Sequence, residues 1–395
     1  MTVLVYVQHL LGIGHLMRAR LIAEALADRG FDVHLVSGGT PIGGRIPRGV
    51  RIVQLPPIRV SDASFTPLRD GEFMPIDEAY RERRRGLLLA AFEAAAPDAV
   101  LFETFPFGRR SLRFELVPLL ERIEAARPRP LVVSSIREIL QLQHKPERER
   151  EMLAWAARWF DAVLVHGDRR FARFEDTFSF AAELMPPVRY TGFVFGSALQ
   201  ARATAGGSRD EVVVSAGGGG VGVELLATAL AAQPLSGLRD LTWRVLAGPN
   251  IPEAGVARLL AAAAPNAIVE RSRADFADLL TRAFVSISQA GYNTTLDVIA
   301  SGARAVIVPF TGNGETEQRA RGERLAHYRL AEILDDRSLT PHVLAQAVDR
   351  AAARTQWGAW DFDSDGATRT AEILTELIAT GRARRTPASA AGPVP

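Results

Sequence analysis

The stretch Ser288-Gln-Ala-Gly-Tyr-Asn-Thr-Thr-Leu-Asp-Val-Ile-Ala-Ser-Gly302 decides the fold that we predict for this chain. One apolar run, over residues 285–288, leads into it, and a second, over residues 305–309, follows it. A strand, a glycine-containing turn, a helix and another strand make a βαβ unit, which builds parallel sheets covered by helices. Gly291 lets the backbone approach a phosphate at the helix start, where free N–H groups bind anions. The stretch therefore predicts an α/β domain with a phosphate-binding helix.

A second glycine-rich turn, Ser215-Ala-Gly-Gly-Gly-Gly-Val-Gly222, also lies between an apolar strand and a helix. Its N–H groups and the helix dipole can receive a diphosphate without a lysine, although a tight turn without a ligand would have the same sequence. The turn also satisfies G-x-G-x-x-G, but dinucleotide sites end the next strand with an acidic residue. Because Ala247-Gly-Pro-Asn250 stands there instead, we expect neither NAD nor FAD as a cofactor.

The N-terminal part of the chain opens in the same way. An apolar run over residues 3–8 leads into the turn Gly12-Ile-Gly-His-Leu-Met-Arg18, and Gly30 is placed to end the helix that follows. His15 then lies at the carboxyl end of the first strand, which faces the crevice where open α/β sheets bind ligands. A neutral imidazole there can take a proton from a hydroxyl, so His15 is the candidate general base. The alternative is a structural histidine at a helix start.

Length and periodicity predict two α/β domains. We predict an N-terminal domain over residues 1–195, a C-terminal domain over 196–367, a closing helix over 368–383 that packs back on the N-terminal domain, and a disordered tail over 384–395. The long polar segment 56–77 is a candidate functional loop. The predicted strands cover residues 3–8, 31–36, 51–55, 99–102, 131–134 and 162–165, and then 211–215, 242–247, 267–270, 285–288 and 305–309.

Composition excludes several classes of function. The chain has 395 residues and no cysteine, which excludes disulfides, thiolate metal sites and a cysteine nucleophile. The start of the chain lacks a basic leader and no apolar run is long enough to span a membrane, so we expect a cytoplasmic protein.

The arginines of residues 81–85 are interpreted as a solvated helix face, so we expect no nucleic acid partner and leave peripheral membrane contact open. Residues 361–372 satisfy the spacing of a calcium loop, but an acidic helix start is preferred and no metal is expected.

The motifs resemble the C-terminal, donor-binding half of GT-B glycosyltransferases. The most similar groups are the peptidoglycan N-acetylglucosaminyltransferase family and an uncharacterised bacterial group of predicted glycosyltransferases. The matching order is a glycine (Gly291), an acid six residues later (Asp297), a glycine after five more (Gly302), an apolar strand with a proline, and then Glu317-Gln318. The resemblance implies two Rossmann-like domains with parallel sheets that face a central cleft. It also implies a hexosyltransferase that moves a sugar from a UDP-linked donor to an acceptor hydroxyl, with inversion and without a metal.

The resemblance also implies roles for individual residues. Diphosphate-binding residues are Gly217, Gly218, Gly219, Gly220, Gly291, Asn293, Thr294 and Thr295. The ribose is held by Asp297, the donor sugar by Glu317 and Gln318, and the base by the loop with Ser272, Arg273 and Phe276. The N-terminal loop supplies Gly12, Gly14, Arg18 and the base His15. Glu103 and Glu138 follow strand ends, so either can orient His15 or bind the acceptor.

Two other functions fit the same residues. A nucleotide-sugar hydrolase or epimerase would use water or the sugar's own carbons in place of an acceptor, and the turn around His15 also resembles a hydrolase of sugar nucleotides in nonulosonate synthesis. A non-catalytic nucleotide-sugar-binding subunit would bind the donor and leave His15 without a chemical role. The residues do not decide between these functions.

Overall fold

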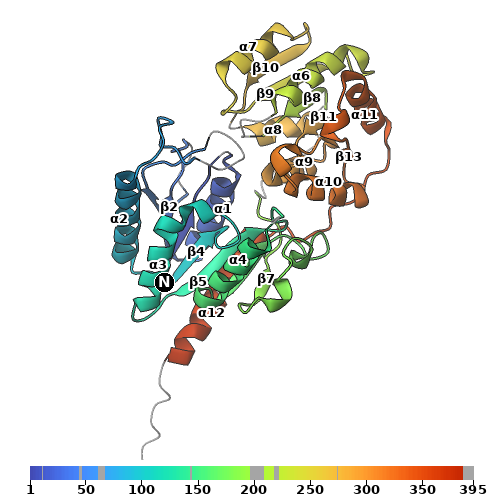
Figure 1. Cartoon of the computed structure of the whole chain (residues 1–395). Coiled ribbons are helices and arrows are strands. Elements are labelled where there is room, and N and C mark those ends of the chain that lie inside the picture. Colours follow the sequence, from blue (N-terminus) through green and yellow to red (C-terminus); the bar gives the residue numbers. More distant parts are fainter. Residues whose placement is uncertain are drawn as a thin grey trace, which may run out of the picture.

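The computed structural model describes residues 1–10, 12–43, 47–60, 67–142, 145–195, 209–217, 222–273 and 275–385. Over these ranges the chain forms two α/β lobes, the N-terminal one below and the C-terminal one above in Figure 1. The division into two α/β domains with parallel sheets is confirmed.

The N-terminal domain is built on a parallel sheet that has seven strands in the described residues, in the order β3-β2-β1-β4-β5-β6-β7. Helices cover both faces, so the inner strands are buried on both sides and appear in the sequence as continuous apolar runs. The strands are β1 (Thr2–Val7), β2 (Asp32–Ser37), β3 (Val50–Gln54), β4 (Ala99–Glu103), β5 (Leu131–Arg137), β6 (Ala162–His166) and β7 (Val188–Tyr190). The helices are α1 (Gly14–Asp28), α2 (Glu78–Ala95), α3 (Arg113–Ala125) and α4 (Pro146–Trp159).

The C-terminal domain repeats this plan with six strands in the described part of the chain, in the order β10-β9-β8-β11-β12-β13. The strands are β8 (Glu211–Ser215), β9 (Thr242–Ala247), β10 (Ala267–Arg271), β11 (Ala283–Ser288), β12 (Arg304–Ile307) and β13 (Glu332–Ile333). The helices are α6 (Val223–Ala232), α7 (Glu253–Ala261), α8 (Phe276–Thr281), α9 (Tyr292–Ser301), α10 (Glu317–His327) and α11 (Pro341–Ala353).

The strand order of each sheet fixes where a ligand binds. The order reverses between β1 and β4 in the first sheet and between β8 and β11 in the second. Open α/β sheets bind ligands at such a point, beyond the carboxyl ends of the strands. The N-terminal reversal lies beside His15 and Glu103, and the C-terminal reversal lies beside Gly217 and Gly291. The candidate residues of both halves therefore lie at the two ligand-binding edges of the fold.

The last helix, α12 (Gly366–Arg385), belongs to the N-terminal domain (Figure 1). Leu374 and Ile378 are buried in the same core as the apolar face of α1, and Glu372 accepts a hydrogen bond from Arg29 over 2.6 Å. The helix extends two residues beyond each end of the predicted range 368–383, and Gly381 lies inside it. A glycine inside a helix costs only about 1 kcal/mol and does not have to end it.

The other differences are small and have local causes. The sequence did not predict β7 or β13, which are too short to show alternation. Gly30 does follow the end of α1, with a φ of 82° that suits glycine. The predicted tail beyond Arg385 and residues 196–208, at the predicted start of the C-terminal domain, lie outside the described residues. In the described ranges, no helix has the length and apolar composition needed to cross a bilayer.

Candidate active site

The N-terminal side of the site is centred on a histidine and a buried glutamate. His15 lies in the first turn of α1, and Glu103 is the last residue of β4, the strand beside β1. Nδ1 of His15 lies 2.9 Å from Oε1 of Glu103 and 3.2 Å from Oγ1 of Thr104. Nε2 makes no hydrogen bond to any residue that the structure describes. The arrangement places the proton on Nδ1, directs it to the carboxylate, and leaves the Nε2 lone pair able to accept a proton.

The charges around the dyad keep the glutamate ionised and the imidazole neutral. Burial alone would raise the pKa of the Glu103 carboxyl, but Arg18, which forms an ion pair with it, lowers that pKa well below its usual range. The pKa of His15 lies well below its ordinary value because the ring is buried and because Arg109 and Arg137 are close. An imidazole that is neutral at physiological pH is the form that a general base requires.

A chain of buried hydrogen bonds supports the far side of the carboxylate. An ionised Glu103 can only accept, so Ser135 donates its hydroxyl proton to Oε2 over 2.8 Å. The Ser135 oxygen then accepts from Nε2–H of His166, 2.7 Å away. Burial lowers the pKa of His166 to about 3, so this ring is neutral and its Nδ1 accepts from the Thr191 hydroxyl over 2.8 Å. Thr191 therefore donates to the ring rather than to the Gly192 carbonyl, 2.9 Å from its hydroxyl.

On the C-terminal side, two glycine motifs that are far apart in the sequence meet at the start of α9. A Cβ added at Gly217 would lie 3.5 Å from Oγ1 of Thr294, and one added at Gly291 would lie 4.0 Å from the same oxygen. Gly217 has a φ of 72°, which side chains other than glycine rarely adopt. Both turns therefore bring the backbone close to a hydroxyl and to the free N–H groups of a helix, as a phosphate site requires. Residues 218–220, which include the predicted Gly218, Gly219 and Gly220, lie outside the described residues.

The start of α9 is held against the N-terminal domain. The Tyr292 hydroxyl donates to the His166 carbonyl over 3.1 Å and accepts from the Val194 N–H over 3.0 Å. The next side chain, Asn293, donates from Nδ2 to the Gly14 carbonyl over 3.2 Å. The helix that is predicted to receive the diphosphate therefore touches the residue that precedes His15.

Asp297 lies further along α9 and makes no hydrogen bond or ion pair with any described residue. Burial raises the pKa of its carboxyl to about 7. A half-buried carboxylate without a protein partner is an acceptor that ligand hydroxyl groups can satisfy. This arrangement suits the predicted contact with the ribose.

The comparisons with known proteins agree with this geometry. Residues 212–357 match the glycosyltransferase family 28 C-terminal domain. The glycosyltransferase of kitacinnamycin is similar over 97% of this chain and 97% of its own, with a TM-score of 0.58 and 17% identity. MurG of Acinetobacter baumannii is similar over 97% of this chain and 99% of its own, with a TM-score of 0.55 and 16% identity. No curated protein sequence matches the chain. The chain has the GT-B glycosyltransferase fold.

GT-B glycosyltransferases bind nucleotide-sugar donors and acceptors, and the predicted sugar-binding pair lies in the part of this chain that matches the family 28 C-terminal domain. Oε1 of Gln318 accepts from the N–H groups of Ala290 and Phe310, at 3.0 and 3.1 Å, so the Gln318 amide nitrogen is left to donate to a ligand. Glu317 is held by two arginines: Arg321 at 2.9 Å and Arg137 of the other domain at 2.5 Å. Burial would raise the pKa of Glu317, but these arginines lower it.

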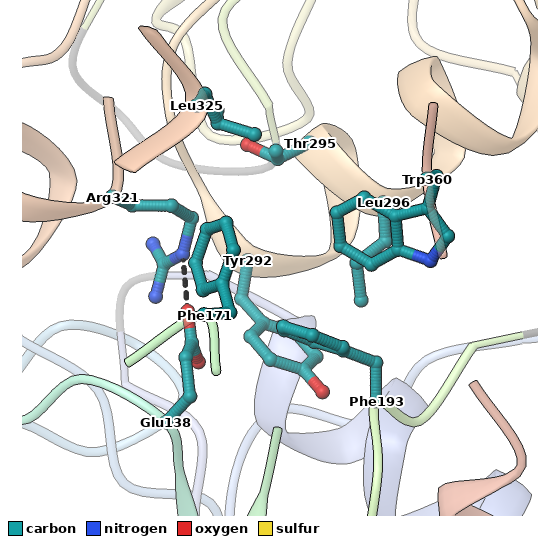
Figure 2. Close-up of a pocket in the computed structure, with 9 residues that line it drawn as sticks. All are labelled: Glu138, Phe171, Phe193, Tyr292, Thr295, Leu296, Arg321, Leu325 and Trp360. Atoms are coloured by element: carbon teal, nitrogen blue, oxygen red, sulfur yellow. Dashed lines mark hydrogen bonds and ion pairs between the residues drawn. The ribbon is translucent and has the colours of Figure 1, made fainter. Parts of the chain in front are cut away.

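Two predicted site residues line a buried pocket between the domains. Glu138 does not orient His15, because its carboxylate accepts from Nε of Arg321 over 2.6 Å (Figure 2), and its contact with the acceptor stays a prediction. Thr295 lines the same pocket, and its buried hydroxyl has no hydrogen-bond partner among the described residues. Both residues are buried because Tyr292 and the aromatic side chains around it close this pocket against water.

The remaining predicted residues make mainly local contacts. The Ser272 N–H donates to the Ala247 carbonyl over 2.8 Å, and Arg273 forms an ion pair with Asp275 at 2.7 Å. Phe276 packs partly against the core. Gly12 is open, with no atom within 4 Å of an added Cβ. None of these positions contradicts the predicted contacts with the base or the N-terminal loop.

Sequence reasoning missed several polar residues of this GT-B site, namely Arg109, Ser135, Arg137, His166 and Arg321. Ser135, Arg137 and His166 lie at or near the carboxyl ends of β5 and β6. The rule that ligands bind beyond the carboxyl ends of strands selected His15 after β1, Glu103 at β4 and Glu138 after β5. Applied to the last residues of β5 themselves and to the end of β6, it would also have selected Ser135, Arg137 and His166.

Proposed function

We propose that this protein transfers a sugar from a UDP-linked donor to an acceptor hydroxyl group, with inversion at the anomeric carbon. The contact between Asn293 and the Gly14 carbonyl, at 3.2 Å, carries the proposal. Because this contact joins the helix start that suits a diphosphate to the residue before His15, a sugar linked to that diphosphate would have its anomeric carbon near the imidazole. The family 28 match of the C-terminal half supports the same assignment of the donor.

His15 acts as the general base in this mechanism. Nε2 takes the proton of the acceptor hydroxyl while the hydroxyl oxygen forms its bond to the anomeric carbon. The imidazolium that results is stabilised through Nδ1–H by Glu103, 2.9 Å away. The acceptor attacks from the side opposite the leaving diphosphate, so the configuration inverts.

The donor domain stabilises the leaving group. The bond from the anomeric carbon to the diphosphate oxygen breaks, and its electrons remain on the diphosphate. The backbone N–H groups around Gly217 and Gly291 and the dipole of α9 are fixed beforehand at the place where this charge develops. These fixed dipoles supply the stabilisation that a metal ion supplies in other transferases. Asp297 accepts from the ribose hydroxyls, and the Gln318 amide donates to the donor sugar.

The test separates binding of the nucleotide from chemistry. We expect UDP to raise the midpoint of thermal unfolding equally in the wild type and in His15→Ala, because ligand binding stabilises the folded state. His15→Ala should lose transfer by about a hundredfold or more, whereas His342→Ala, at an exposed position of α11, should not.

Three outcomes would contradict the proposal. Release of the nucleotide at the full rate without any acceptor would make the protein a hydrolase. Unchanged transfer in His15→Ala would show that His15 is not the general base. An unchanged midpoint of thermal unfolding with every nucleoside diphosphate would show that the protein has no donor site.

A further inference from the structure

Arg18, the cation that forms the ion pair with Glu103, is buried and has N–H groups that the ion pair does not use. The residue is 1% exposed, and Nη2 is the nitrogen that binds the carboxylate. Nε and Nη1 are also buried and make no hydrogen bond to any residue that the structure describes. Buried donors without hydrogen bonds are unfavourable, so another group must stabilise the guanidinium in this position.

The ring of Tyr292, which comes from the other domain, covers this guanidinium. Cζ of Arg18 lies over the ring, 5.1 Å from its centroid, which is within the range of a cation–π contact. Such a contact is strongest where water is excluded, and Tyr292 is only 4% exposed. Tyr292 is the first residue of α9 and directly follows Gly291. The group that covers Arg18 therefore belongs to the helix start that is proposed to bind the donor diphosphate.

Hydrogen bonds and packing fix the Tyr292 ring in this orientation. Its hydroxyl donates to the His166 carbonyl over 3.1 Å and accepts from the Val194 N–H over 3.0 Å. Burial raises the pKa of this hydroxyl well above its usual range, so it stays protonated and remains a donor. The ring of Phe193 packs beside it, with 6.1 Å between the two centroids (Figure 2). The ring cannot turn away from Arg18 without breaking these contacts.

The position of Arg18 matters for the base because one of its nitrogens lies near both members of the dyad. Nη2 binds Oε1 of Glu103 and lies 3.4 Å from Nδ1 of His15. While Arg18 stays at the carboxylate, Oε1 accepts the proton of Nδ1, and Nε2 of the ring keeps its lone pair. A guanidinium that moved toward the imidazole would donate to Nδ1 instead. The ring proton would then lie on Nε2, which could no longer take a proton from the acceptor.

We propose that Tyr292 is a positioning residue for the general base, because its ring holds Arg18 at Glu103 and so keeps the proton of His15 on Nδ1. The inference rests on the proposed transfer reaction, in which His15 is the base. The aromatic face makes the contact with Arg18, so phenylalanine can replace tyrosine in this role. Because the ring belongs to the donor domain, the base is complete only when the start of α9 is packed against the N-terminal domain.

The experiment follows the His15 ring by NMR in the full-length protein saturated with UDP. Long-range ¹H–¹⁵N correlations distinguish a proton on Nδ1 from one on Nε2, and His15→Ala identifies the signals by their loss. We expect the Nδ1–H form in the wild type and in Tyr292→Phe. Tyr292→Leu removes the aromatic face, so the ratio of the Nδ1–H form to the Nε2–H form should fall about tenfold or more. Its affinity for UDP should stay close to that of the wild type.

Phe193→Leu is the matched control, because Phe193 is also buried between the domains but its ring contacts are with other aromatic rings. It should lower the free energy of unfolding as Tyr292→Leu does and leave the His15 proton on Nδ1. Tyr292→Met is the second variant, because the flexible methionine side chain fills more of the space than leucine without an aromatic face. It keeps the test valid if Tyr292→Leu does not fold.

Three results would overturn the inference while the base and the donor site stand. The first is an unchanged Nδ1–H form in the folded leucine or methionine variants of Tyr292. The second is a shift in Phe193→Leu as large as theirs, and the third is loss of the Nδ1–H form in Tyr292→Phe. If wild-type His15 carries its proton on Nε2, or if UDP does not bind, the proposed function fails instead.

Discussion

Nδ1 of His15 lies 2.9 Å from Oε1 of Glu103. His15 is in the first turn of α1, which follows β1, and Glu103 ends β4, the strand beside β1 at the point where the strand order reverses. The carboxylate holds the proton on Nδ1 and so leaves Nε2 free to act as a base. Glu103→Gln removes the charge that stabilises the imidazolium. We expect kcat to fall by about a hundredfold or more, with little change in the affinity for UDP. Steady-state kinetics and UDP titrations measure both quantities.

Glu121→Gln is the control for this prediction, because Glu121 is exposed on α3. A loss of UDP affinity in Glu103→Gln as large as the loss in kcat would mean that the substitution disturbs the fold of the site rather than the base.

The hydrogen-bond chain behind the dyad gives a second prediction. Ser135 is buried and passes a hydrogen bond from His166 to Oε2 of Glu103. Ser135→Ala leaves that oxygen without its donor, so we expect kcat to fall about tenfold and the ring ¹⁵N signals of His15 to shift toward a mixture of tautomers. Ser134→Ala is the matched control, since the neighbouring hydroxyl donates to the Phe105 carbonyl instead. Equal effects of the two substitutions on the His15 signals would show that the hydrogen bonds from His166 through Ser135 to Glu103 play no part in the mechanism.

The pH dependence of transfer follows from the environment of His15. Burial, Arg109 and Arg137 hold its pKa well below the ordinary value, so the ring is neutral in the folded protein through the usual range of histidine titration. Protonation removes the base, so activity is present above the folded pKa and is lost as the pH falls through it. We therefore expect kcat, measured with saturating donor, to stay level when the pH is lowered through about 6.5 and to decrease only at more acidic pH. A midpoint at the ordinary histidine value would contradict the buried, cation-facing position of the ring.

The sequence determined the donor side of this site better than the acceptor side. Gly217 and Gly291 follow strands, and Asp297 lies on the helix after Gly291. This order is readable from apolar runs and glycines in the local sequence. Arg109, Ser135 and His166 make contacts between segments that are far apart in the chain. Nothing in the local sequence of Ser134-Ser135 says which hydroxyl faces Glu103.

The same reason explains why the sequence did not show that Glu138 and Thr295 line the contact between the domains. Glu138 and Thr295 fit their motifs by position, but their side chains are turned into the contact between the domains, where Arg321 and the ring of Tyr292 lie. The sequence of one domain does not specify which of its side chains the other domain covers.

We predict that Asp297 releases a proton when the nucleotide binds. Burial raises the pKa of its carboxyl to about 7, so part of the population is protonated at pH 6 to 7. Two ribose hydroxyls that donate to the carboxylate favour its ionised form, so binding releases the proton and becomes weaker as the pH falls below about 7, by up to about tenfold per pH unit. Calorimetry at pH 6 in two buffers with different ionisation enthalpies measures the released proton.

Asp297→Asn is the comparison that isolates this carboxyl from protons of the nucleotide itself. The variant should bind UDP more weakly at pH 8 and should release less proton at pH 6 than the wild type. Identical proton release in the two proteins would mean that the carboxyl of Asp297 does not contact the ligand.

Substitution of Arg321 tests how the two domains are held together. It is almost fully buried, and its guanidinium joins Glu138 of the N-terminal domain, at 2.6 Å, to Glu317 of the donor site, at 2.9 Å. Arg321→Ala leaves two buried carboxylates without their shared cation, and breaking a buried pair in this way costs about 3–5 kcal/mol. We expect a large decrease in the free energy of unfolding, measured by denaturant titration, and a higher KM for the donor because Glu317 loses its position.

Arg319→Ala provides the matched control, because Arg319 lies on the same helix but is exposed and pairs with Glu323 on the surface. Surface pairs contribute little, so this variant should unfold close to the wild type. If charge compensation is the cause, adding Glu138→Gln to Arg321→Met should restore most of the lost stability, since Glu317 keeps Arg137 as its partner and no carboxylate is then buried without one. A double variant that is as unstable as Arg321→Ala would show that the packing of the arginine stem, and not its charge, joins the domains.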